Sequence, residues 1–324
     1  MSKNRKDGKY IKPEDSIHAI MPYLFKNRTE AEVYMKAEFD VTKLVEYVDK
    51  LNKESDYPIT YFHAFTTAIA KVIYNRPLLN RFVAGRRMYE RNKVTFSFVA
   101  KNKFEDNAQE RLIILDAYKS MNLDEISKFI QDKVSKTRKE GTNDINDTLK
   151  FVTSFPRFIT KAIVRFFYFL DYHGLVPSSI ADTDSNYATV LLSNLGSIKS
   201  ASCYHHLNNY GTNSIVATIG EIHKINYLTE TGKVKEKTIV DMSFTLDERI
   251  ADGFYFAKSI KLLEYIINNP ELLNDEISKE VNYENWYTLV KSIWKYKSKL
   301  WLSRYKFSRF FRRNCKKIPY TYCL

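Results

Sequence analysis

The stretch SFTLDERIADG, from Ser243 to Gly253, joins two different hydrophobic patterns. Its first part belongs to KTIVDMSFTLDER (237–249), one of three neighbouring strand patterns, several of which are almost continuously apolar, as expected for a sheet covered on both faces. Residues 251–269 then carry apolar side chains at helical spacing and stop before Pro270. The stretch therefore predicts a buried strand, a short charged turn and a helix.

The remainder of the chain mixes strand and helix patterns in the same way. Strands are predicted at 30–40, 93–102, 110–118, 187–197, 214–228 and 237–249. Helices are predicted at 42–54, 60–76, 122–141, 155–171 and 251–269. Helices combined with strands of both the alternating and the fully apolar kind indicate an α/β layered fold rather than a doubly wound one. The sequence contains no glycine-rich phosphate loop of the two familiar kinds.

Composition places the chain among ordinary globular proteins. Its 324 residues suffice for one large domain or two smaller ones, and 44% of them are hydrophobic. The three cysteines, Cys203, Cys315 and Cys323, cannot all pair, so we expect a reducing compartment and a cytoplasmic location. Residues 1–14 form a polar leader without the apolar core of a signal peptide, and no run of about eighteen apolar residues predicts a membrane span.

The positive charge is concentrated near the C-terminus. Residues 281–324 contain eleven Lys and Arg and a single acid, Glu284, whereas the net charge of the whole chain is +13. Trp, Tyr and Phe are interleaved with these cations, which suits an anionic membrane surface, packing against the domain or a partner, or RNA. Nucleic acid is the least favoured, because no RNA-binding module accompanies the segment. We expect a basic aromatic helical tail over 274–324 and a peripheral membrane contact through 281–324.

Three segments, in this order, resemble the catalytic domain of dihydrolipoamide acyltransferases and, more distantly, chloramphenicol acetyltransferase. They are MKAEFDVTKLVEYVDKL (35–51), LLSNLGSIKS (191–200), and VATIGEIHK (216–224) running on to MSFTLDERIADG (242–253). The resemblance spans about residues 15–273. It implies a two-layer α/β sandwich, a mixed sheet with helices on one side, and a homotrimer with active sites between subunits. CoA or acyl-CoA would enter one end of a channel and the acyl acceptor the other.

The resemblance assigns roles to particular residues. Glu248 stands where the family has its catalytic histidine, and Asp252 matches the aspartate that holds the active-site loop in shape. Ser193 matches the serine whose hydroxyl stabilises the oxyanion, on which negative charge grows during acyl transfer. The implied activity is the transfer of an acyl group from acyl-CoA to a hydroxyl, thiol or amine acceptor.

The glutamate at 248 leaves the identity of the base open. An ordinary Glu has a pKa of about 4.3 against about 6.5 for His, so it is a weaker base at neutral pH. Burial and the neighbouring Asp247 and Asp252 would raise this pKa, whereas an inward-turned Arg249 would cancel the effect. The pair His205 and His206 offers a relocated base. The remaining alternative is a noncatalytic trimeric scaffold or a sensor of acyl-CoA, in which Glu248 pairs with Arg249 or another neighbour.

Two features depart from the family pattern. No lipoyl domain precedes the catalytic region, so we expect no lipoyl group on this chain and no role as the core of a 2-oxo acid dehydrogenase complex. An added apolar helix at 155–171 carries Arg157, Lys161 and Arg165 four residues apart. It is interpreted either as a core or interface helix with its charged stripe in water, or as a membrane-surface helix. No metal site is predicted, because Cys203 with the following histidines lacks the spacing of a zinc site.

Overall fold

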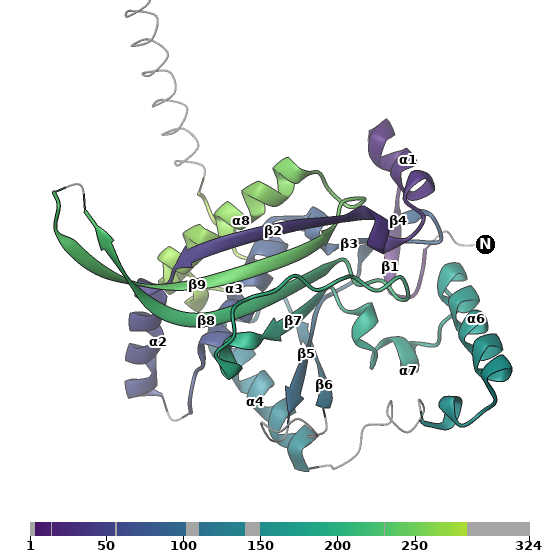
Figure 1. Ribbon diagram of the computed structural model, residues 1–324, viewed down its shortest axis with the longest axis horizontal. Coiled ribbons are helices and arrows are strands. Elements are labelled where there is room, and N and C mark those ends of the chain that lie inside the picture. Colours follow the sequence, from purple (N-terminus) through teal and green to yellow (C-terminus); the bar gives the residue numbers. More distant parts are fainter. Residues whose placement is uncertain are drawn as a thin grey trace, which may run out of the picture. The chain divides into compact units, whose positions relative to one another are not determined.

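The computed structural model describes residues 4–13, 15–55, 57–101, 110–139, 150–229 and 231–283 (Figure 1). The described part up to Lys279 forms one compact unit. Within it, residues after the predicted border at 273 are tied to the body: the Ile277 N–H donates to the Met121 carbonyl over 2.8 Å, and Ile277 is fully buried. Apart from its first three residues, the segment 281–324 lies outside the described residues, and so does the predicted tail contact.

A six-stranded mixed sheet forms the centre of the unit. Its strands, in spatial order, are β2 (Glu32–Asp40), β9 (Val234–Asp247), β8 (Ile215–Leu228), β7 (Val190–Asn194), β5 (Val94–Lys101) and β6 (Glu110–Ala117). The strand β7 runs parallel to both β8 and β5, and the other pairs are antiparallel. The predicted mixed sheet is confirmed.

Four helices pack against one another and against this sheet, as Figure 1 shows. They are α2 (Thr42–Glu54), α3 (Tyr61–Asn75), α4 (Leu123–Lys139) and α8 (Gly253–Asn268). Every residue of α3 from His63 to Ile73 is buried, so this helix is the centre of the helical layer. The predicted cap of α4 is present, since the Asn122 side chain accepts a hydrogen bond from the Glu125 N–H over 3.1 Å. The helices and the sheet make the two predicted layers.

Alternation along the strands gives the sheet two different faces. Leu192, Ala217 and Phe244 lie side by side on neighbouring strands and belong to the buried core. The next row of paired residues consists of Ser193, Thr218 and Ser243, and it lies on the opposite face of the sheet. The core face is therefore apolar, whereas the other face carries a row of hydroxyl groups.

A second, three-stranded sheet was not predicted. It has the order β1 (Gly8–Ile11), β4 (Arg87–Arg91) and β3 (Arg81–Ala84), all antiparallel, and β1 lies within the predicted polar leader. The further helices are α1 (Ser16–Leu24), α6 (Arg157–His173) and α7 (Ser178–Ala181). Short 3-10 helices occur at Arg28–Ala31, Pro77–Asn80, Ser185–Tyr187, Leu195–Ile198 and Pro270–Asn274. Strands of four or five residues rich in Arg and Lys give no clear period in the sequence.

The added helix α6 lies on the surface of the unit and not in its core. Asp171 is the one fully buried residue of α6, while Phe158, Phe166 and Phe169 are exposed. Within the described residues, no helix combines the length and the hydropathy needed to cross a membrane.

Candidate functional site

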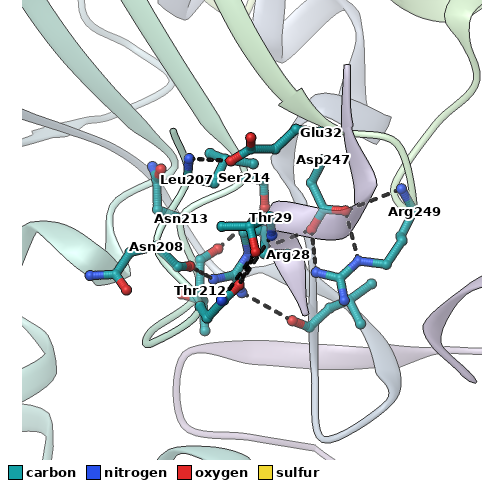
Figure 2. Close-up of polar contacts among 12 residues, drawn as sticks. Arg28, Thr29, Glu32, Leu207, Asn208, Thr212, Asn213, Ser214, Asp247 and Arg249 are labelled. Carbon is teal, nitrogen blue, oxygen red and sulfur yellow. Dashed lines mark hydrogen bonds and ion pairs between the residues drawn. The ribbon is translucent and has the colours of Figure 1, made fainter. Parts of the chain in front are cut away.

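The turn between β9 and α8 is built around a buried carboxylate, Asp247 (Figure 2). Arg249 binds it in bidentate fashion, with Nε 2.8 Å from one oxygen and Nη2 2.7 Å from the other. The Nε of Arg28 lies 3.5 Å from the same carboxylate on its other side. All three side chains are buried, so two guanidinium groups share one anion away from water.

Arg28 connects this turn to two other segments. Its Nη2 donates to the carbonyl of Gly211 over 2.9 Å and to that of Val83 over 3.2 Å, and its Nη1 donates to the carbonyl of Asn208. Burial lowers the pKa of the Arg28 guanidinium, and the charge of Asp247 opposes this shift. The sequence analysis missed Arg28, because a lone arginine after a polar loop has no pattern that would reveal such a contact.

Glu248 follows the buried carboxylate in the chain and takes no part in its ion pairs. Its backbone N–H donates to the carbonyl of Ala31 over 2.9 Å, which fixes the main chain, and its side chain is half-buried. Arg249 turns inward onto Asp247 and forms no ion pair with Glu248. Among the described residues, no hydrogen bond or ion pair engages the Glu248 carboxylate. The pairing of Glu248 with Arg249, considered from the sequence, is therefore wrong.

Asp252 begins helix α8. It is the N-cap, and its side chain accepts a hydrogen bond from the Tyr255 N–H over 2.7 Å. The cap satisfies one of the free N–H groups at the start of the helix and sets the direction in which the chain leaves the turn. This geometry gives Asp252 a structural role at the start of α8, and its role in an active-site loop stays a prediction.

We expect Asp252→Ala to lower the free energy of unfolding by about 1 kcal/mol, because the first turn of α8 loses its cap. Asp252→Asn should keep nearly all of that stability, since an amide oxygen caps as well as a carboxylate does. Urea unfolding of both variants measures the difference. Equal losses in the two variants would show that the charge of Asp252, and not its capping oxygen, holds the loop.

Ser193 lies near the end of β7 on the polar face of the sheet. Among the described residues its hydroxyl has no hydrogen-bond partner, whereas its neighbours in the row are engaged. Ser243 lies 2.8 Å from the hydroxyl of Ser202, and Thr218 donates to the carbonyl of Cys203 over 2.5 Å. The half-buried Ser193 hydroxyl therefore remains available as a donor at the edge of this row.

The backbone beyond Ser193 is held closely against β8. The 3-10 helix Leu195–Ile198 follows directly, and a Cβ at Gly196 would lie 2.4 Å from the carbonyl oxygen of Gly220. Gly220 itself lies at an irregularity in the pairing of β8 with β9. Only glycine permits such an approach, so the two glycines fix the position of the loop next to Ser193.

Within one chain, Ser193 and Glu248 are well separated. Ser193 is level with Ser243, which precedes Asp247 by four residues along β9, and β8 lies between β7 and β9. Strand geometry places Asp247 about 13 Å along the strands and about 10 Å across them from Ser193, and Glu248 follows Asp247 at the turn. A single reacting group cannot contact both side chains of one chain at the same time.

The two candidate histidines lie on the loop that Arg28 binds. Their exposed rings stack with centroids 4.7 Å apart, and the ring nitrogens contact the carbonyls of His206 and Leu207. The Leu207 N–H donates to Glu32, the residue paired with Asp247, so the loop passes the same end of the sheet as the turn. No described hydrogen bond joins either histidine to Glu248 or Ser193, and the role of His205 and His206 as a base stays a prediction.

The described residues include no cluster of three or more His, Cys, Asp or Glu side chains arranged to hold a metal ion. The chemistry available at the described site comes from a free carboxylate, a free hydroxyl and the two exposed imidazoles.

Comparison with known proteins connects these features to one group of enzymes. Residues 177–274 match the family of 2-oxoacid dehydrogenases acyltransferase (catalytic domain), a region that includes Ser193, Glu248 and Asp252. No curated protein matches the chain in sequence.

Several of the solved structures that resemble the chain are acetyltransferases. A probable dihydrolipoamide acetyltransferase from Listeria monocytogenes superposes with a TM-score of 0.53 and 17% identity, covering 81% of this chain and 95% of the other. The dihydrolipoamide acetyltransferase of Azotobacter vinelandii gives 0.54 and 13%, covering 81% and 94%. A chloramphenicol acetyltransferase gives 0.51 and 10%, covering 80% and 99%. The chain thus has the α/β fold of the dihydrolipoamide and chloramphenicol acetyltransferases, and over residues 177–274 it matches the catalytic domain of the 2-oxoacid dehydrogenase acyltransferase family.

Proposed function

We propose that this protein transfers an acyl group from acyl-CoA to a hydroxyl, thiol or amine acceptor. The fold and the family match at 177–274 support acyl transfer as the reaction class. The main observation in favour of this proposal is that the Ser193 hydroxyl and the Glu248 carboxylate have no hydrogen-bond partner among the described residues. They stand at the two positions where the resemblance places the oxyanion donor and the base. Both are half-buried, so both can be reached by a substrate and partly shielded from water.

In the proposed reaction, the acceptor attacks the thioester carbonyl while Glu248 takes its proton. The Ser193 hydroxyl donates a hydrogen bond to the oxyanion of the tetrahedral intermediate. The carbon–sulfur bond then breaks, and the CoA thiolate recovers the proton from Glu248. A carboxylate is a weaker base than an imidazole, so we expect slower turnover than a histidine at this position would give.

The separation of Ser193 from Glu248 supports a site shared between subunits. If Glu248 of one protomer faces Ser193 of the next, both groups reach one thioester, although they are far apart in a single chain. Closed symmetric oligomers repeat such a contact at every interface. We therefore propose a homotrimer with a site at each of its interfaces.

Calorimetric titration with CoA and with acetyl-CoA tests the proposal without knowledge of the acceptor. We expect micromolar binding of both, because the two ligands share the whole of CoA and differ only in the acetyl group. Ser193→Ala and Glu248→Gln should bind CoA as the wild type does, since neither side chain acts before the chemical step. Absence of binding in a folded oligomer would contradict acyl transfer and favour the noncatalytic scaffold. Binding without turnover on a panel of acceptors would favour the acyl-CoA sensor.

A further inference from the structure

Helix α6 presents aromatic side chains to the outside of the described unit. Phe158, Phe166 and Phe169 are 74%, 59% and 54% exposed. At 100° per residue they project from one side of the helix. A soluble surface helix normally turns its apolar stripe toward the core. Helix α6 keeps half-buried apolar residues on its inner side and, in addition, presents these three phenylalanines to the outside.

The orientation of α6 is fixed by a polar anchor. Buried Asp171 accepts hydrogen bonds from the hydroxyl of Tyr187 over 2.8 Å and from the N–H of Gly211 over 3.1 Å. Because these bonds occupy both carboxylate oxygens, the helix cannot rotate its phenylalanines inward without breaking them. The exposed aromatic face is therefore a stable feature of the fold.

Three cations lie beside the aromatic residues. Arg157, Lys161 and Arg165 are spaced one helical turn apart, and Asp171 is the one acid of α6. None of the three forms an ion pair with another described residue. An open groove of about 870 Å³ runs along this side, and its lining includes Phe155, Phe158 and Val164 together with the three cations.

A second exposed apolar helix lies beside the same part of the small sheet. Helix α1 has no acidic residue, and its Ile17, Ile20 and Leu24 are exposed. The turn between β3 and β4 contacts both helices: a Cβ at Gly85 would lie 2.5 Å from the carbonyl oxygen of Tyr172, and Arg86 lies over the Tyr23 ring at 5.8 Å. The turn therefore adds its own cation between the two helices.

We propose that α6, together with α1, docks onto an anionic membrane surface. Exposed aromatic and aliphatic side chains next to cations that form no ion pair with a described residue match the boundary between acyl chains and anionic headgroups. A second copy of the chain in a two-fold contact is a poorer occupant, because that symmetry would bring Arg157, Lys161 and Arg165 against their own counterparts. The helix lies on the membrane, since it is too short and too charged to cross it.

Vesicle flotation of the full-length protein tests this proposal. The vesicles contain phosphatidylcholine alone, or phosphatidylcholine mixed with phosphatidylglycerol. We expect binding to the anionic vesicles, and a loss of about tenfold in bound protein for Phe158→Ser/Phe166→Ser/Phe169→Ser and for Arg157→Gln/Lys161→Gln/Arg165→Gln. All six side chains are at or near the surface, so both variants should keep the wild-type melting temperature.

Two matched controls carry equivalent changes elsewhere. Leu228→Ser/Val234→Ser removes exposed apolar groups from the β8–β9 hairpin, and Lys128→Gln/Lys224→Gln/Lys237→Gln removes three cations from other surfaces. Both should bind the vesicles within about twofold of the wild type. If the controls lose as much vesicle binding as the α6 variants, binding depends only on the net charge and hydropathy of the protein. This result would overturn the proposal.

Hydrogen–deuterium exchange locates the contact, which matters because residues 281–324 are also basic. With anionic vesicles, amides in 157–173 and 16–24 should exchange more slowly, and with phosphatidylcholine they should not change. Flotation without protection of α6 would place the contact elsewhere and refute the proposal. A change in oligomer size in the phenylalanine variant, with vesicle binding intact, would identify a second copy as the occupant instead.

Discussion

Ser193→Ala and Glu248→Gln, each nearly inactive alone, are expected to regain about a quarter of the wild-type rate when co-expressed in equal amounts. Each change alone should lower the rate of acyl transfer about a hundred- to ten-thousandfold, through loss of an oxyanion donor or of the base. In a shared site, half of the chains supply an intact Ser193 and half an intact Glu248. A random mixture therefore brings both together at about one interface in four. Release of free CoA, followed with a thiol reagent, measures the rate.

The control replaces one parent by the double variant Ser193→Ala/Glu248→Gln. Co-expressed with Ser193→Ala, it should give no recovery, because no chain then carries Ser193. If the two single variants also fail to complement each other, the site does not combine Ser193 and Glu248 from different protomers. Full activity of Glu248→Gln would instead make His205 or His206 the base, which His205→Ala and His206→Ala can then separate.

Asp247→Asn is expected to lower the free energy of unfolding by about 3–5 kcal/mol, the range measured when one partner of a buried ion pair is removed. The amide would leave Arg28 and Arg249 next to each other in the interior without an anion, although it has the size of the native carboxylate. Urea unfolding, followed by circular dichroism at 222 nm, provides the measurement.

The matched control is Asp241→Asn on the same strand. Asp241 pairs with Lys36 over 2.9 Å at the exposed side of the sheet, where an ion pair contributes about 0–1 kcal/mol. A loss at Asp247 no larger than the loss at Asp241 would show that water reaches the two arginines after the substitution. The backbone hydrogen bonds of the turn, and not the two ion pairs, would then be what holds its conformation.

The central layers could be predicted from the sequence because their residues follow clear periods. Helix α3 is apolar around nearly its whole circumference, β8 begins as a nearly continuous apolar run, and β9 ends with an apolar side chain at every second residue, so burial and local pattern agree. The small sheet could not be predicted in this way. Its strands β3 and β4 include Arg81, Arg87 and Arg91, and Arg91 becomes buried through hydrogen bonds to Tyr187 and Thr212, residues far away in the sequence.

The candidate site, too, could be predicted from the sequence only in part. The position of Asp252 at the start of a helix follows from an Asp before an apolar helical pattern, and the structure has it as the N-cap. The inward turn of Arg249 depends on a carboxylate two residues away and on Arg28 from another part of the chain. The order of charges in the sequence therefore could not show which way the Arg249 side chain turns. The aromatic face of α6 was predicted as apolar, but its exposure depends on where Asp171 finds its partners.

The inward pairing of Arg249 also separates two tasks within one short turn. Position 247 holds the backbone in place through both arginines, while position 248 contributes only its main chain to that frame. The side chain at 248 can therefore vary without disturbing the scaffold. During evolution, an acid, an amide and an imidazole can therefore replace one another at position 248 with little loss of folding stability. The same property makes it a convenient site for directed evolution, where a small saturation library would sample catalytic groups on a constant framework.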